Sequence, residues 1–81
     1  MNLLVVFYSR GGTIETLANA VADGARSAGA DVQLRRAREL VSAETMALAP
    51  GWSESAERMN AIYPAPSVED ARWADGFAFG T

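Results

Sequence analysis

Five consecutive residues that are small, polar or cationic, Ser9-Arg10-Gly11-Gly12-Thr13, lie between an apolar run and a helical pattern. The two glycines let the backbone turn tightly and approach an anion without obstruction by a Cβ atom. Ser9 and Thr13 add hydroxyl groups that can donate hydrogen bonds. Where such a join opens a helix, unpaired backbone N–H groups and the positive end of the helix dipole also attract an anion. The pattern therefore predicts a phosphate-binding loop that requires no lysine.

The spacing of the glycines excludes two common nucleotide-binding motifs. Gly11 and Gly12 do not fit the G-x-G-x-x-G dinucleotide fingerprint, and the chain has no lysine for a G-x-x-x-x-G-K-[ST] loop. What remains suits a single phosphomonoester, such as that of a mononucleotide cofactor. The alternative is an ordinary strand-to-helix turn in which glycine supplies the turn, Thr13 caps the helix and nothing binds. Arg10 either adds positive charge for the anion or is solvated.

The composition removes most other kinds of active site. The chain has no cysteine and no histidine among its 81 residues, so it lacks disulfides, thiolate metal ligands and the commonest general base. No nucleophile–base pair is visible, and we predict no catalytic residue and no metal site within the chain. Glu69 and Asp70 are better explained as residues that open a helix than as a catalytic pair.

Charge and hydropathy limit the partners. The net charge is -3 and the pI about 4.7, and no basic stripe is present, so nucleic acid is not expected as a partner. The longest apolar run, residues 3–8, is too short to span a membrane. It also lacks the basic start and the cleavage site of a secretory signal, so we expect a cytoplasmic protein.

The elements that must position the loop are predicted from periodicity. Residues 3–8 are continuously apolar, as in a parallel strand that is covered on both faces. Residues 13–28 form a helix whose apolar stripe includes Leu17 and Val21 and is widened by Ile14, Ala18, Ala20 and Ala25. Gly29 provides its stop. Asp31–Arg36 alternates between apolar and polar residues, as in a strand near the edge of a sheet. Strand, helix and strand together predict a βαβ unit and an α/β fold.

The second half of the chain predicts shorter elements. Residues 39–49 can form a short helix, and residues 53–62 another turn or two with Trp52, Met59 and Ile62 as apolar anchors. Ser67 is expected to cap a helix over Val68–Trp73, with Asp70 as its capping-box partner. Gly76–Gly80 then reads as a third strand.

That third strand would be unpaired along one edge, which favours aggregation. We therefore expect residues 1–81 to be the N-terminal part of one larger domain, truncated after the third strand.

Three further groups of residues have two interpretations each. The basic cluster of Arg35, Arg36 and Arg38 is better explained as a solvated strand edge than as a site for a nucleotide phosphate. Trp52 and Trp73 are expected to anchor loops to the core rather than to stack on a cofactor ring. Glu15 is a favourable first-turn carboxylate, and it should point away from a bound phosphate because the two would repel each other.

The segment VVFYSRGGTIETLANAVADGARSAGADVQL resembles the start of flavodoxin-like proteins, and more closely that of the WrbA-type NAD(P)H:quinone oxidoreductases. The ending DGFAFGT is similar to the third strand of that family. The resemblance implies a flavodoxin-like parallel sheet in three layers, with strand order 2-1-3-4-5 when complete and strands 2-1-3 present here. Many members have an aromatic residue at the position of Gly11 and a histidine at that of Thr13.

The resemblance further implies FMN as the cofactor, bound through its phosphate by Ser9, Arg10, Gly11, Gly12, Thr13 and Ile14. The reaction would be two-electron reduction of a quinone with NAD(P)H as co-substrate, in a protein that assembles as a dimer or tetramer. The family's ring-binding loops and its nicotinamide and quinone pocket follow the matched region, so the 81-residue chain is expected to be inactive alone. The alternatives are a non-catalytic electron-carrier flavodoxin and an inactive fragment that binds no cofactor.

Overall fold

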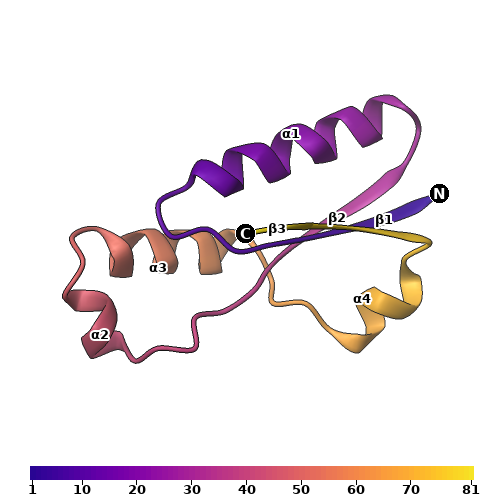
Figure 1. The fold of residues 1–81 in the computed structure, drawn as a ribbon. Coiled ribbons are helices and arrows are strands. Elements are labelled where there is room, and N and C mark those ends of the chain that lie inside the picture. The colour runs from indigo at the N-terminus through magenta and orange to yellow at the C-terminus, as the bar shows by residue number, and fades with distance from the viewer.

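A computed structural model describes all residues of the chain, 1–81. The chain forms three strands and four helices, and Figure 1 shows how they are arranged. In chain order they are β1 (Asn2–Phe7), α1 (Thr13–Ser27), β2 (Asp31–Arg36), α2 (Ala43–Ala47), α3 (Trp52–Ile62), α4 (Val68–Trp73) and β3 (Gly76–Gly80). The predicted α/β class is therefore confirmed. None of the helices has the length and apolar character needed to cross a membrane.

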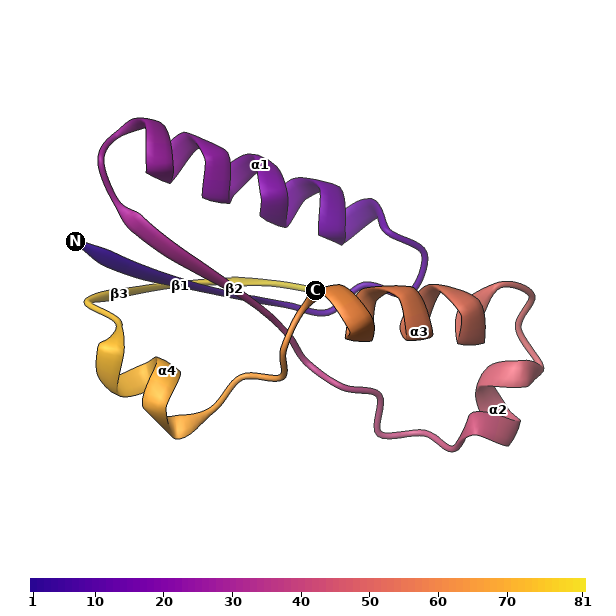
Figure 2. The same cartoon turned by 180° about the vertical axis from the view of Figure 1, so that it is seen from behind.

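The sheet is entirely parallel, with strand order β2-β1-β3. Val5 of β1 stands opposite Leu34 of β2 and Ala78 of β3. This confirms the 2-1-3 order expected for a flavodoxin-like arrangement. Helix α1 covers one face and the short α4 lies against the other, while α2 and α3 lie beyond the carboxyl ends of β1 and β2 (Figures 1 and 2). The central position of β1 explains its uninterrupted apolar sequence.

Helix α1 ends as its sequence predicts. Gly29 adopts a φ of 93°, and its N–H donates to the carbonyl of Arg26 at 2.9 Å. The next N–H, that of Ala30, donates to Ala25 O at 3.0 Å. A residue with positive φ and two such backward bonds is the usual way to satisfy the last carbonyls of a helix.

The packed face of α1 agrees with the predicted stripe only in part, since Ala18 belongs to that stripe and Ala22 does not. Ala18 and Ala22 are buried, whereas Leu17 and Val21 are 57% and 48% exposed. The small alanines let α1 lie close to β1. On the side of α1 toward β3, Leu17 and Val21 line an open apolar groove of about 480 Å³ with Ala78 and Phe79 of the strand.

The core joins the sheet, α1 and α3. Its buried members are Val5, Phe7, Ala18, Met59 and Tyr63. The rings of Phe7 and Tyr63 meet edge to face, with centroids 4.9 Å apart. The prediction for Met59 is confirmed.

Helix α3 touches this core along one side only. Because α3 lies beyond the carboxyl ends of the strands rather than on the sheet, only Ala56, Met59 and the following Tyr63 are buried. The prediction that Ile62 anchors this segment is wrong, since Ile62, the last residue of α3, is 57% exposed.

The capping box of α4 is confirmed. Ser67 Oγ accepts from the N–H of Asp70 at 3.2 Å, and the Asp70 carboxylate accepts from the N–H of Ser67 at 2.9 Å. The same carboxylate accepts from Arg35 Nε at 3.0 Å. Asp70 is therefore buried between α4 and β2, and it fixes this helix to the sheet.

The outer edge of β3 is free. Phe77 and Phe79 stack on each other, with centroids 6.1 Å apart, and both are exposed. The unpaired edge expected from the sequence is therefore present, with two aromatic rings beside it.

Candidate phosphate-binding loop

Residues 9–12 leave the carboxyl end of the central strand and lead directly into α1 (Figure 1). This is the edge of a parallel sheet at which α/β proteins bind ligands. Ser9 is buried, whereas Arg10, Gly11 and Thr13 are exposed. The loop therefore has a fixed base and an accessible rim.

The start of α1 has no side-chain cap. Gly12 is the N-cap residue with a φ of 109°, and Thr13 is the first helical residue rather than the cap. The expectation of a Thr13 cap, which belonged to the ordinary-turn alternative, is therefore wrong. The Gly12 carbonyl accepts from the N–H and the hydroxyl of Thr16, both at 3.0 Å.

Several backbone donors around this start have no acceptor in the protein. The N–H of Gly12 donates to Ser9 Oγ at 2.9 Å, but the N–H groups of Arg10 and Gly11 donate to no protein atom. Helical geometry also leaves the N–H groups of the first turn, from Thr13 onward, without intrahelical acceptors. These donors lie together at the positive end of a helix of 15 residues.

The two glycines have different roles. A Cβ on Gly11 would meet nothing within 4 Å, so this position accepts a side chain, which agrees with the aromatic residue in many WrbA-type proteins. Gly12 has the left-handed φ, and a Cβ there would lie 3.5 Å from Glu15 Oε1. Only Gly12 is therefore required by the backbone.

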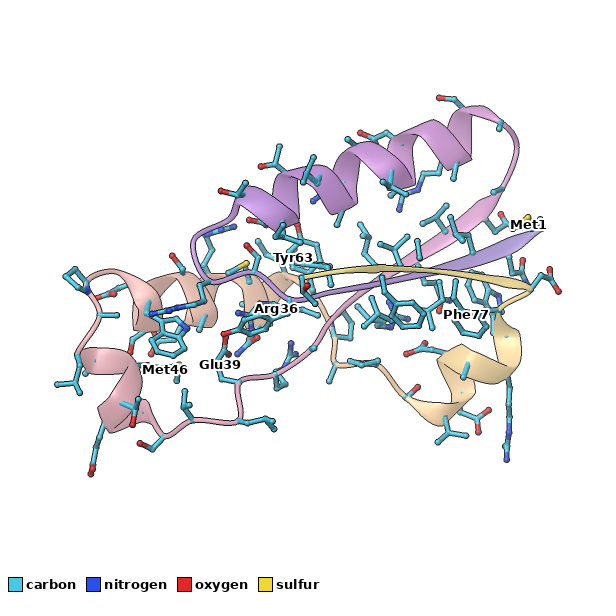
Figure 3. The ribbon with its side chains drawn as sticks, in the orientation of Figure 1. Met1, Arg36, Glu39, Met46, Tyr63 and Phe77 are labelled. Atoms are coloured by element: carbon cyan, nitrogen blue, oxygen red, sulfur yellow. The ribbon has the colours of Figure 1, made fainter.

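The base of the loop is held from β2. The buried Arg36 donates from Nη2 to the carbonyl of Ser9 at 2.8 Å. The same guanidinium binds the carboxylate of Glu39 with both Nη atoms and Asn60 Oδ1 at 2.7 Å. Figure 3 shows Arg36 and Glu39 side by side at this end of the sheet. The Arg36 guanidinium lowers the pKa of the Glu39 carboxyl.

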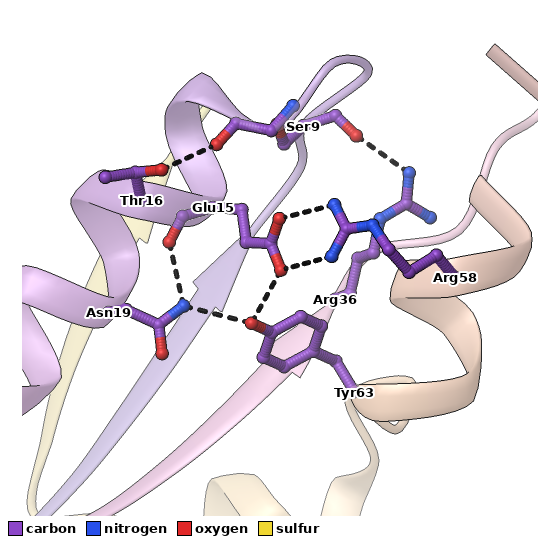
Figure 4. A network of polar contacts seen from close by, with 8 residues as sticks. Ser9, Glu15, Thr16, Asn19, Arg36, Arg58 and Tyr63 are labelled. Carbon is purple, nitrogen blue, oxygen red and sulfur yellow. Dashed lines mark hydrogen bonds and ion pairs between the residues drawn. The ribbon is translucent and has the colours of Figure 1, made fainter. Parts of the chain in front are cut away.

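The first turn of α1 is tied to α3 by a polar network (Figure 4). Glu15 accepts from Arg58 Nη1 and Nη2 at 3.0 and 2.7 Å and from the hydroxyl of Tyr63 at 2.8 Å. That hydroxyl in turn accepts from Asn19 Nδ2 at 3.0 Å. Arg58 lowers the pKa of the Glu15 carboxyl, and burial raises the pKa of Tyr63. The Glu15 carboxylate thus faces α3, where Arg58 balances its charge beside the loop.

Arg10 is stacked rather than freely solvated. Its guanidinium carbon lies 3.8 Å from the centroid of the Trp52 ring at the start of α3. Arg10 and Gly11 form one side of a cavity of about 170 Å³ whose other side is residues 49–52 and Ser55. Trp52 therefore packs against the loop.

The three arginines near the end of β2 are not a solvated edge, which corrects the sequence-based interpretation. Arg35 pairs with Asp70, and Arg36 is fully buried beneath Ser9. Arg38 donates to the carbonyls of Arg36 and Tyr63 at 3.0 and 2.9 Å. Each guanidinium is used to hold backbone or a carboxylate in place.

The six predicted residues thus have separable functions. Ser9 and Gly12 shape the base, and Arg10 and Thr13 present polar side chains at the rim. Gly11 is exposed with open space around its Cα, and Ile14 packs its side chain toward Gly80. Sequence reasoning missed Arg58 and Tyr63, and it assigned Arg36 to a solvated strand edge. These three side chains reach the loop or its helix across 27 to 48 positions of the chain. The only local signal was that basic side chains gather at the end of β2.

Comparison with known proteins gives one consistent result. A protein named NAD(P)H dehydrogenase (quinone) from Rhodopseudomonas palustris (strain BisA53) is 40% identical over 79 residues, which are 98% of this chain. Proteins of the same name from Afipia carboxidovorans and Syntrophobacter fumaroxidans are 42% and 44% identical over 79 and 82 aligned residues. No protein-family model matches the chain.

The chain spans 37% of the length of the first two of these curated relatives and 39% of the third. Within that share the similarity runs along the whole chain. The resemblance to NAD(P)H:quinone oxidoreductases inferred from the loop and from β3 is therefore confirmed.

Proposed function

We propose that residues 9–14 bind the phosphate of FMN, and that the chain contributes this site to an NAD(P)H:quinone oxidoreductase. The observation that carries the proposal is the start of α1, where a left-handed Gly12 leads into a helix without a side-chain cap. Unpaired N–H groups at such a terminus favour a phosphate group.

The donor set fits a phosphomonoester. The backbone N–H groups of Arg10 and Gly11 and those of the first helical turn can donate to phosphate oxygens, and Thr13 adds an exposed hydroxyl. The Ser9 hydroxyl accepts from the N–H of Gly12, and its own proton can be donated to the ligand. Arg10 supplies positive charge at the rim from its position over Trp52.

The activity of the whole protein is inferred from its relatives. Proteins named NAD(P)H dehydrogenase (quinone) match the chain along its whole length, which favours the enzyme over an electron-carrier flavodoxin. When bound, FMN would supply the hydride chemistry between NAD(P)H and a quinone. The residues of this chain would hold and orient the phosphate end, in an assembly of two or four subunits.

The proposal is tested by titrating the 81-residue chain with FMN and with riboflavin, which differs only by lacking the phosphate, while following flavin fluorescence. We expect FMN to bind with a Kd above about 1 μM, because a phosphate site alone supplies a small part of the affinity for a flavin. Riboflavin should bind at least about tenfold more weakly, which is the effect of losing charge-assisted hydrogen bonds.

Inorganic phosphate should displace FMN from the chain. Equal affinity for FMN and riboflavin, or no binding of FMN by the folded chain, would contradict the assignment of the loop. A tight FMN complex that phosphate does not displace would show that the flavin is held elsewhere.

A further inference from the structure

Arg36 is the largest fully buried side chain of the protein, although it carries a formal charge. It stands at the last position of β2, beside the carboxyl end of β1. Four contacts hold its two Nη atoms, namely two to Glu39, one to Asn60 and one to the carbonyl of Ser9. A buried guanidinium needs such partners, since each unpaired donor in the interior is unfavourable.

The contact of Arg36 with the Ser9 carbonyl differs from the other three in what it connects. It is the only hydrogen bond that ties residues 9–12 to an element other than α1. Ser9 is held at its carbonyl by Arg36, and its hydroxyl accepts from the N–H of Gly12. Arg36 therefore holds Ser9 in place, and Ser9 in turn holds Gly12, the N-cap residue of α1.

The charge of Arg36 is balanced at close range. The side chain of Glu39 is only 5% exposed and bonds both Nη atoms of the guanidinium. Such a neutralised pair has a weak field at the rim of the loop. Its effect on an anion must then come from where it places Ser9, rather than from attraction over a distance.

We propose that Arg36 is a positioning residue for phosphate binding: it fixes the Ser9 carbonyl so that Ser9 and Gly12 hold the loop in its anion-binding shape. This inference rests on the proposed function of the loop. Asn60 and Glu39 in turn hold the guanidinium, so α3 and the segment after β2 both contribute to the base of the site.

The test uses R36K with R35K as its matched control. Lysine keeps the charge of Arg36 but lacks the planar fork that reaches Ser9, Glu39 and Asn60 together. Arg35 is the preceding residue and pairs with Asp70, on the other face of the sheet, next to α4. Both variants weaken one ion pair at adjacent positions, and only R36K disturbs the loop.

Two measurements are made on the 15N-labelled 81-residue chain at about 20 μM, below the range in which association through β3 is expected. Inorganic phosphate is titrated while the amide signals of Gly11, Gly12 and Thr13 are followed by NMR, and hydrogen exchange of the Gly12 N–H is measured without ligand. For R36K we expect the Kd for phosphate to rise about tenfold and the exchange of Gly12 to accelerate about tenfold, because the preorganised shape is lost. R35K should change either quantity less than about twofold.

N60A provides a second variant if R36K does not fold. Asn60 is exposed and on α3, and its loss removes one contact of the guanidinium while Arg36 stays in place. We expect the Kd for phosphate to rise about threefold. This is the size of effect expected when one hydrogen bond is lost that holds Arg36 and does not contact the anion itself.

The possible outcomes distinguish failure of the proposed role of Arg36 from failure of the proposed function of the loop. If the wild-type chain shows no phosphate-dependent shifts in the loop, the proposed function fails and the role of Arg36 fails with it. If the wild type binds phosphate but folded R36K and N60A bind it equally well, only the role of Arg36 is overturned. Equal weakening by R36K and R35K would likewise overturn it, because the effect would then reflect stability alone.

Discussion

Glu15 and Arg58 form an ion pair of two hydrogen bonds, 2.7 and 3.0 Å long, between the first turn of α1 and the middle of α3. Glu15 is the residue after the proposed phosphate site, and its carboxylate is only 12% exposed. The pair joins the loop's helix to the segment beyond the carboxyl ends of the strands. It also places one negative and one positive side chain beside the position where an anion is proposed to bind.

Substituting the two members of this pair should change phosphate affinity in opposite directions. E15Q removes negative charge and should lower the Kd for phosphate, whereas R58M leaves the carboxylate unbalanced and should raise it, each by about twofold to fivefold at low salt. Phosphate titration at about 20 mM and 500 mM salt measures the effect, which should shrink at the higher salt. R72M removes an exposed pair with Glu69 on α4 and is the control. Changes of the same sign in E15Q and R58M would contradict this account.

The two adjacent glycines of the loop should respond differently to alanine. G12A forces a side chain into a backbone with a φ of 109° and should destabilise the chain by about 1–2 kcal/mol. G11A adds a methyl group to open space and should change stability by less than about 0.5 kcal/mol. Urea denaturation gives both values. Equal effects of the two substitutions would mean that the loop has another backbone shape.

Local sequence patterns predicted the helices and strands well, but they did not predict the contacts between residues far apart in the chain. Asp31–Arg36, Val68–Trp73 and Gly76–Gly80 have the predicted bounds, because β alternation, a capping box and a short apolar run are each encoded by neighbouring residues. The bonds of Ser9 to Arg36 and of Glu15 to Arg58 span 27 and 43 positions. The periodicity of the sequence does not indicate which of several arginines contacts the loop.

The packing of α1 on the sheet shows a second limit of prediction from sequence. Helical spacing places Leu17 and Val21 at the centre of one apolar stripe, with Ala18 at its margin and Ala22 outside it. Hydrophobicity favoured the larger residues for burial. The structure buries the alanines because close approach of α1 to β1 needs small side chains there.

This packing predicts unequal effects on the two sides of α1. A22L inserts a large side chain into a fully buried position and should destabilise the chain by about 1–3 kcal/mol. L17A removes a side chain that is more than half exposed and should cost less than about 1 kcal/mol. Thermal unfolding followed by circular dichroism compares the two. A larger loss in L17A would mean that the predicted stripe, and not the alanine face, packs on the sheet.

The free edge of β3 should drive self-association of the isolated chain. Phe77 and Phe79 are exposed beside unpaired backbone groups, which is the kind of edge that recruits further strands. F79K should therefore lower the association measured by analytical ultracentrifugation at about 50–200 μM, a range in which exposed edges commonly aggregate. L48K replaces an exposed apolar residue outside the sheet and is the control. If L48K prevents association as well as F79K does, general hydrophobicity and not the strand edge is responsible.

Acid should destabilise the chain through three paired carboxylates. Hydrogen bonds from Arg58, Arg36 and Arg35 lower the pKa values of Glu15, Glu39 and Asp70 below their ordinary values of 4.5, 4.5 and 3.8, respectively. The unfolded chain then binds more protons than the folded chain once the pH falls through these ordinary values. Stability should therefore be constant from about pH 7 to 5 and fall steadily below about pH 4.5.

Thermal unfolding at a series of pH values measures this loss. E39Q should be less stable than the wild type at pH 7 but lose less stability between pH 5 and 3, since one of the three carboxylates no longer takes up a proton. E44Q changes an exposed glutamate that makes no ion pair, and it should follow the wild-type curve. A melting temperature that stays flat down to pH 3, or an E39Q curve parallel to that of the wild type, would show that the Arg36–Glu39 pair does not stabilise the folded chain.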